Sequence, residues 1–288
     1  MLELRKITTK DGLTFDAWIE GPESGEIVLL LHGFPQSRHT WRAQVPALAA
    51  AGYRVIAPDQ RGYSPGARPD PADLSNYSYS NLVWDGLNVV EACGGGAKRF
   101  HLVGHDWGGQ VSWGLGAWFG AQRLASLTIL SRPHPTAFAR ALQAADGDQK
   151  HRSRHHRAFL NPDTARLLTE DGAHRLRRTL ADAGVPADAV ELYVSVLGAP
   201  EAMEAALAWY RAQKDLRIDL QFEVTVPTLY VWGDADHSVS RLAADGTASC
   251  VSGPYRFVAL PGIGHFSTDQ VPARINELLL EHIGAHKA

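Results

Sequence analysis

The stretch Val103-Gly104-His105-Asp106-Trp107-Gly108-Gly109 decides the fold, because it joins a short apolar run directly to a helical pattern. Glycine stands two positions before and two positions after Asp106. A residue at such a strand-to-helix corner adopts strained backbone angles, and bulky side chains two residues away would collide. The strain lifts the corner side chain above the carboxyl edge of a parallel sheet, where open α/β folds bind ligands. We therefore predict that Asp106 is a nucleophile; the alternative is an ordinary glycine turn with a capping aspartate.

The rest of the chain alternates apolar runs with helical patterns, which indicates a mostly parallel, doubly wound α/β sheet. Continuous apolarity is typical of strands that are covered on both faces. The N-terminal segments 2–8 and 13–20 alternate in polarity instead, so we predict an antiparallel hairpin at the sheet edge that turns at Asp11-Gly12. The predicted buried strands are residues 27–31, 54–57, 101–103, 127–130, 228–232 and 256–260.

Residues 133–217 interrupt this alternation. The segment is helical in composition, contains no strand candidate, and carries the basic run His151-Arg152-Ser153-Arg154-His155-His156-Arg157. We interpret it as a helical cap inserted between two strands. The α/β core is then formed by residues 1–132 and 218–288.

Composition excludes several classes of partner and site. The formal net charge of −3 argues against a nucleic-acid partner, and no apolar run approaches the roughly 20 residues of a membrane span. The N-terminus lacks the apolar run of a signal peptide. The only two cysteines, Cys93 and Cys250, lack metal-type spacing and suit reduced thiols. We expect a cytoplasmic protein without a metal or an organic cofactor, and whether it forms a homo-oligomer stays open.

An aspartate at the corner narrows the chemistry. A carboxylate is a poor nucleophile towards esters, but it displaces a leaving group at saturated carbon. The product is an ester on the protein, which water then cleaves at the ester carbonyl. The expected electrophile is therefore an epoxide or a halide.

Hydrolysis of that ester needs a general base and a carboxylate that orients the base. In the chain order nucleophile, acid, histidine, the candidates follow the last two predicted strands. We predict that His265 is the base and Asp236 the orienting acid, with Asp234 as the alternative acid. The oxyanion that forms on the ester should be bound by the backbone N–H groups of Trp107 and Phe34.

Five ordered motifs resemble the α/β-hydrolase-fold epoxide hydrolases and their sisters, the hydrolytic dehalogenases. The resemblance covers essentially the whole chain. It implies the α/β-hydrolase fold with a helical cap, an aspartyl-ester mechanism, and a small hydrophobic epoxide as substrate. The motifs are His32-Gly33-Phe34-Pro35, Asp59-Gln60-Arg61-Gly62-Tyr63-Ser64, Gly104-His105-Asp106-Trp107-Gly108-Gly109, Trp232-Gly233-Asp234-Ala235-Asp236 and Gly264-His265-Phe266.

The resemblance also implies two cap tyrosines over the nucleophile. The stretch Ala205-Ala206-Leu207-Ala208-Trp209-Tyr210-Arg211 looks like the second, so Tyr210 is the expected proton donor and Trp209 a candidate substrate contact. Where the first tyrosine is expected stands His155, or His156 if the register slips by one residue. A histidine there would make activity pH-sensitive near neutrality. Alternatively, the basic run is a solvated face without a role.

Two further observations favour an epoxide over a halide. Phe34 stands where some dehalogenases carry a halide-contacting asparagine. Trp107 and Gln110 occupy the region where fluoroacetate-type dehalogenases carry carboxylate-binding arginines. Dehalogenation by the same Asp106 nucleophile is the alternative within enzymes. A ligand-binding protein with little turnover is the alternative of another class, and the altered first cap position is the feature that favours it.

Overall fold

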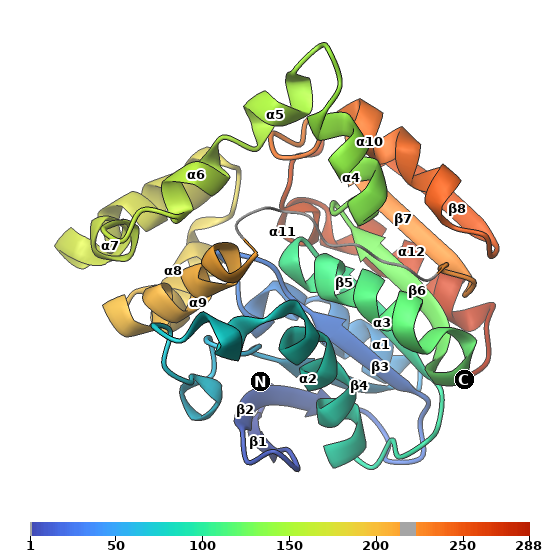
Figure 1. Cartoon of the computed structure of the whole chain (residues 1–288). Helices are drawn as coiled ribbons and strands as arrows, with labels where there is room; N and C mark the ends of the chain where they lie inside the picture. The colour runs from blue at the N-terminus through green and yellow to red at the C-terminus, as the bar shows by residue number, and fades with distance from the viewer. Residues whose placement is uncertain (1, 214–222) are drawn as a thin grey trace.

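The computed structural model describes residues 2–213 and 223–288, and an eight-stranded sheet forms its centre (Figure 1). The strand order is β1-β2-β4-β3-β5-β6-β7-β8. β1 pairs antiparallel with β2, and β2 with β4, whereas all other neighbours are parallel. The α/β class and the hairpin at the sheet edge are therefore confirmed. The strands are β1 Leu4–Thr8, β2 Thr14–Glu20, β3 Ile27–Leu31, β4 Arg54–Pro58, β5 Phe100–His105, β6 Leu124–Leu130, β7 Thr228–Gly233 and β8 Tyr255–Leu260.

Helices connect most of the parallel strands. Within the described ranges, none of them is both long enough and apolar enough to cross a membrane. Two depart from helical geometry internally: α3 at Gly120, and α7 at residues 170–173. The helices are α1 Gln44–Ala50, α2 Tyr79–Ala92, α3 Trp107–Arg123, α4 Pro135–Leu142, α5 Asp148–Arg152, α6 His155–Phe159, α7 Thr164–Asp182, α8 Ala187–Leu197, α9 Pro200–Ala212, α10 Arg241–Gly246, α11 Ser267–Gln270 and α12 Pro272–Gly284.

The sheet separates two apolar cores, because successive side chains of a strand point to opposite faces. In β3, Leu29 packs into the core shared with α2 and α3, whereas Leu30 packs into the core shared with α1 and α12. These helix pairs cover opposite faces of the sheet (Figure 1). Burial on both faces explains why the sequence of β3 is apolar throughout.

The segment between β6 and β7 is helical, as expected. Helices α4 to α9 occupy it, and no strand occurs between residues 133 and 213. In Figure 1, α5 lies at the top of the view and α6 to α9 lie at the left. The expected boundary between cap and core at residues 217 and 218 lies outside the described residues.

The corner between β5 and α3 has the geometry that its glycines require. Asp106 adopts φ 49° and ψ −114°, outside the regions favoured by residues with a side chain. A Cβ on Gly108 would collide with the carbonyl oxygen of Leu31 and lie 2.6 Å from that of His32. A Cβ on Gly104 would in turn collide with the carbonyl oxygen of Gly108. Strand β3, the corner and α3 therefore approach one another closely only because these positions are glycine.

We predict that Gly108→Ala lowers the free energy of unfolding by about 2 kcal/mol or more, because the added methyl group overpacks a rigid backbone contact. Gly246→Ala is the matched control. It is also helical, but its Cβ would meet only Ala137 at 3.5 Å, an ordinary contact. Urea unfolding followed by circular dichroism should show a loss for the first variant and none for the second. Equal stabilities of the two variants would contradict the steric account.

Candidate active site

Asp106 presents its two carboxylate oxygens to different partners. The backbone N–H of Phe34 donates to Oδ1 at 3.0 Å, and His265 Nε2 lies 3.7 Å from Oδ2. Gly33 makes this approach possible, because a Cβ there would lie 2.8 Å from Asp106 Oδ1. Trp107 begins α3, whose first N–H groups have no partner within the helix. The carboxylate thus lies between potential oxyanion donors on one side and an imidazole on the other.

His265 lies between two carboxylates. Its Nδ1 is 3.0 and 3.1 Å from the two oxygens of Asp236, which is fully buried after β7. Because a carboxylate only accepts hydrogen bonds, Nδ1 carries a proton, and Nε2 faces Asp106. The alternative acid, Asp234, is exposed and accepts from the N–H of Gly262 at 2.6 Å, so it closes a loop. The structure therefore brings Asp106, His265 and Asp236 together and leaves Asp234 outside.

The electrostatics of this group favour a charged imidazole. Burial by itself would lower the pKa of His265, but the carboxylates of Asp236 and Asp106 outweigh it and raise the pKa to about 9. Burial would raise the pKa of Asp236, yet its contacts with His265, Ser131 and the Ser238 N–H lower it. Asp236 is therefore ionised, and His265 is protonated at neutral pH while Asp106 carries its charge.

A cavity of about 580 Å³ opens above these residues. Its floor includes Phe34, Asp106 and His265, and the helices between β6 and β7 contribute His155 and Tyr210. Leu168 and Leu176 of α7 and Phe159 of α6 add apolar surface to the wall. This site is concave and combines apolar side chains with several polar ones, among them Asp182 and Gln270, so it suits a small molecule.

Tyr210 reaches the cavity from α9, a buried helix that begins at Pro200. Its ring packs edge-on against Phe34 and Trp107, with centroid separations of 5.4 and 5.0 Å. Burial and the charge of Asp106 raise the pKa of the phenol well above its usual range. Tyr210 is therefore protonated and able to donate a hydrogen bond in the cavity that contains Asp106.

The two candidate histidines lie on different sides of α6. His155 lines the cavity above Asp106, whereas His156 does not. Burial lowers the pKa of His155, and it lowers that of His156 to about 2, so both are neutral near pH 7. The expectation that a histidine here makes activity pH-sensitive near neutrality is thus not supported, because burial moves both titrations to lower pH.

The hydrogen bonding of His155 also restricts its role. Its Nδ1 lies 2.9 Å from the carbonyl oxygen of Arg152, which only accepts, so the single proton of the neutral ring is on Nδ1. The other nitrogen, Nε2, is then an acceptor. His155 cannot replace a tyrosine as a donor to a substrate oxygen while it is neutral.

Trp209, the candidate substrate contact beside Tyr210, is not part of the cavity lining. Its indole N–H donates to the carbonyl oxygen of Arg61 at 2.9 Å, and its ring packs against Trp107. Arg61 itself forms a two-pronged ion pair with Asp85. Trp209 therefore joins α9 to the loop after β4, a structural position.

Sequence reasoning did not identify two residues of the site, Ser131 and Arg132. Both follow β6 directly, and the carboxyl ends of parallel strands are where such residues are expected. The Ser131 hydroxyl donates to Asp236 at 2.6 Å and lies 2.9 Å from His265 Nδ1. The position of both residues immediately after a buried strand was the available signal.

Arg132 is a buried cation beside the nucleophile. Its Nε donates to Gln110 at 2.7 Å, and its guanidinium lies over the rings of Phe138 and Trp107, 4.4 and 5.9 Å from their centroids. Its charge opposes protonation of His265.

Among residues 2–213 and 223–288, no cluster of three or more His, Cys, Asp or Glu side chains is arranged to hold a metal ion.

A family model and similar proteins of known sequence agree on the family of this chain. Residues 26–270 match the model of the alpha/beta hydrolase fold family. The AB hydrolase superfamily protein YfhM of Bacillus subtilis is 31% identical over 95% of each chain. Epoxide hydrolase A of Mycobacterium tuberculosis is 32% identical over 92% of each chain.

Solved structures agree with the sequence comparison. The crystal structure of an epoxide hydrolase from Bacillus megaterium in complex with an inhibitor superposes with a TM-score of 0.86 at 25% identity. The match covers 97% of this chain and 100% of that one. The chain therefore belongs to the α/β-hydrolase fold family, in which its relatives include epoxide hydrolases.

Proposed function

We propose that this protein hydrolyses an epoxide to a vicinal diol through an ester on Asp106. The observation that carries the proposal is the arrangement around Asp106: the Phe34 N–H at one oxygen, His265 at the other, and the Tyr210 phenol in the same cavity. The names of the relatives, which include Epoxide hydrolase A, support the substrate class.

In the first step, Asp106 attacks an epoxide carbon and the C–O bond of the ring breaks. Tyr210 donates its phenolic proton to the oxygen that leaves, giving an alcohol. This donor matters because an alkoxide is a strong base and a poor leaving group, whereas a halide leaves as a stable anion. The buried, protonated Tyr210 therefore favours an epoxide over the halide of the alternative dehalogenase.

In the second step, water cleaves the ester. His265 Nε2 takes a proton from water, and the hydroxide attacks the carbonyl carbon of Asp106. The backbone N–H groups of Phe34 and Trp107 stabilise the oxyanion. The ester C–O bond then breaks, the protonated His265 returns the proton to the leaving alkoxide, and the diol departs. The proton that remains on the Asp106 carboxyl group passes to the Tyr210 phenolate, which restores both groups. Asp236 orients the imidazole, and Asp106 retains one oxygen from water.

Formation of the ester prepares His265 for this role. The negative charge of Asp106 is one reason why the pKa of His265 is raised to about 9. The ester is neutral, so alkylation removes that contribution while Asp236 remains. The pKa of His265 then falls, which favours the unprotonated ring in the step that requires a base.

The experiment that tests the function is turnover of a styrene-oxide-type epoxide in ¹⁸O-labelled water, with mass analysis of the Asp106 peptide. The wild type should give diol and carry label in the Asp106 carboxylate. His265→Gln should accumulate the ester, because it keeps the nucleophile but removes the base, and Asp106→Asn should give neither ester nor diol. Halide release from haloalkanes without diol formation would support the dehalogenase instead. Tight binding of the epoxide without either product would support a ligand-binding protein.

We further predict that Asp106→Asn lowers the pKa of His265 relative to the wild type. The amide has the shape of the carboxylate but lacks the charge that helps to hold the imidazole protonated. NMR titration of the His265 ring measures this pKa directly and needs no substrate. Asp234→Asn is the control, since Asp234 contacts the Gly262 N–H and should leave the His265 titration unchanged. A pKa of His265 that is the same in Asp106→Asn and wild type would rule out the linkage.

A further inference from the structure

A second cavity of about 490 Å³ lies on the other side of α6. The helical repeat places His155 and Phe159 on the stripe that lines the cavity above Asp106, whereas His156 and Leu160 fall on the adjacent stripe and line the second cavity. Tyr210 contributes to the walls of both. The proposed proton donor therefore borders both cavities.

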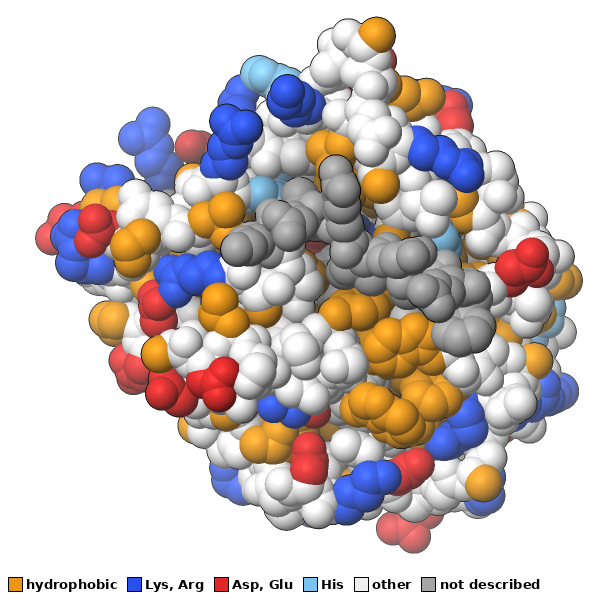
Figure 2. All heavy atoms as spheres, viewed as in Figure 1, with side chains coloured by type: hydrophobic (Ala, Val, Ile, Leu, Met, Phe, Trp, Pro, Cys, Tyr) orange, Lys and Arg blue, Asp and Glu red, His pale blue; other side chains and the backbone are white. Residues whose placement is uncertain are grey.

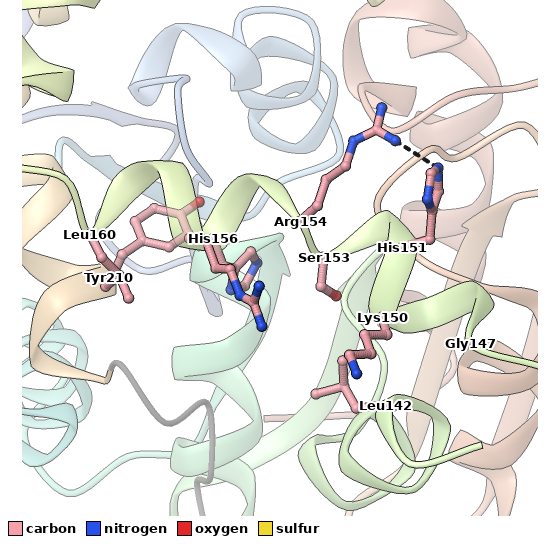
Figure 3. A pocket seen from close by; sticks show the side chains of 10 residues that line it. Leu142, Gly147, Lys150, His151, Ser153, Arg154, His156, Leu160 and Tyr210 are labelled. Carbon is pink, nitrogen blue, oxygen red and sulfur yellow. Dashed lines mark hydrogen bonds between the residues drawn. The ribbon is translucent and has the colours of Figure 1, made fainter. Parts of the chain in front are cut away.

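The wall of the second cavity combines cations with an apolar surface, as Figure 3 shows. The cations are Lys150 of α5, Arg157 of α6, and Arg154 between the two helices, whose Nη1 lies 2.7 Å from His151 Nε2. Leu142 and Leu160 supply apolar surface, together with the Tyr210 ring. No aspartate or glutamate occurs among the described residues that line it. We call this site the basic cavity.

The positive charge at this site is local. The whole chain has a formal net charge of −3, yet Figure 2 shows Lys and Arg side chains gathered over α5 and α6 at the top of the view. The nearby carboxylate of Asp148 is engaged by Arg152 at 2.9 Å. His156 adds no charge, because burial lowers its pKa to about 2, but its buried Nδ1 has no hydrogen-bond partner among the described residues.

We propose that the basic cavity binds the anionic end of the substrate, which is then an epoxide with a carboxylate on an apolar chain. The carboxylate lies among Lys150, Arg154 and Arg157, and the chain lies against Leu142 and Leu160. The chain passes Tyr210 to place the epoxide at Asp106. This inference deepens the proposed function and rests on it. It specifies that one end of the substrate is anionic, which the cavity above Asp106 does not indicate by itself.

Direct binding tests the site without any turnover. Octanoate should bind the wild type more tightly than octanol in calorimetry, and more weakly as salt is raised, because partly exposed ion pairs are screened. Octanoate should also inhibit epoxide hydrolysis competitively. Equal affinities for octanoate and octanol, or inhibition that is not competitive, would overturn the proposal. A failure of the proposed function leaves the octanoate measurement intact, so the two failures are distinguishable.

Charge-neutral variants locate the site. In Lys150→Gln/Arg154→Gln/Arg157→Gln, KM for a medium-chain acid with a terminal epoxide should rise about tenfold, as expected when several modest ion pairs are lost together. KM for the methyl ester of that acid should not change. The matched control is Arg5→Gln/Lys10→Gln/Arg274→Gln, which removes three positive charges from exposed ion pairs elsewhere on the protein. Equal changes for acid and ester, or the same effect in the control, would contradict the assignment.

A second inference rests on a different observation, the position of Ser131. Its backbone has φ 68°, a left-handed conformation that glycine would adopt without strain. The hydroxyl donates to Asp236 Oδ2 at 2.6 Å, whereas the N–H groups of Ser238 and Val239 donate to Oδ1 at 2.7 and 3.3 Å. Each oxygen of the carboxylate is thus held separately. Apart from His265, Ser131 is the only residue in the described ranges whose side chain or backbone donates to Oδ2.

The geometry points to Ser131 as a positioning residue for ester hydrolysis. By fixing the rotation of the Asp236 carboxylate, and by lying 2.9 Å from His265 Nδ1, it keeps Nε2 directed at the Asp106 ester. The first step of the proposed mechanism does not use His265 as a base. Loss of the hydroxyl should therefore slow hydrolysis of the ester and leave its formation unchanged. This inference also rests on the proposed function.

Ser131→Gly is the sharpest test, because glycine keeps the left-handed backbone and removes only the side chain. We expect kcat to fall about ten- to a hundredfold, the range for loss of a hydrogen bond to a charged group. KM should not rise, and ester should accumulate on Asp106.

The control for this variant is Ser126→Ala. Ser126 lies in β6, and its buried hydroxyl is likewise 2.9 Å from a histidine Nδ1, that of His101. Its removal should leave the ester lifetime unchanged. An unchanged ester lifetime in Ser131→Gly would show that the hydroxyl has only a structural role. Absence of ester in the wild type would instead reject the proposed function itself.

Discussion

The backbone of Asp106 is the constraint on which the rest of the site depends. A side chain at φ 49° is tolerated only where the surrounding structure holds it, and here β3, β5 and α3 meet around it. Gly33, Gly104 and Gly108 allow the three elements to approach so closely that no Cβ fits between them. The same approach brings the Phe34 N–H to the carboxylate. Strain at one residue and the absence of side chains at three others thus produce a single result, a carboxylate exposed to a cavity with a donor already in place.

Around Asp106, the charge and burial of neighbouring groups determine which side chain is protonated and can donate, and which can accept a proton. One imidazole faces two carboxylates, and a buried guanidinium nearby opposes its protonation. This balance raises the pKa of His265 while both carboxylates are charged, and in the mechanism that we propose it shifts towards the free base once Asp106 is esterified. Burial has the opposite consequence for the tyrosine, since it keeps the phenol of Tyr210 protonated as a donor. The resting charges therefore suit both proposed steps, a protonated phenol for the first and an imidazole whose pKa falls before the second.

The sequence was sufficient for features that depend on local pattern. Each predicted buried strand lies within an observed strand, because apolar runs covered on both faces have a distinctive composition. Motif spacing likewise located Asp106, Asp236 and His265 at the ends of strands. Ser131 was missed because its partner Asp236 is 105 residues away, so their contact depends on the parallel pairing of β6 with β7. The choice between His155 and His156 depends on the rotational phase of a five-residue helix, which its own sequence does not determine.

Helix α6 keeps its positive charge away from the Asp106 carboxylate. A free cation beside Asp106 would pair with the carboxylate and weaken it as a nucleophile. The stripe of α6 towards Asp106 therefore presents Phe159 and a neutral His155, and its cationic side chain, Arg157, lines the basic cavity instead. Arg132 is close to the nucleophile, but its guanidinium lies over aromatic rings and its Nε is bonded to Gln110. Positive charge is thus available on one side of Tyr210 for the anionic substrate end that we propose, while on the other side the Asp106 carboxylate accepts a hydrogen bond from the Phe34 N–H and faces the His265 imidazole.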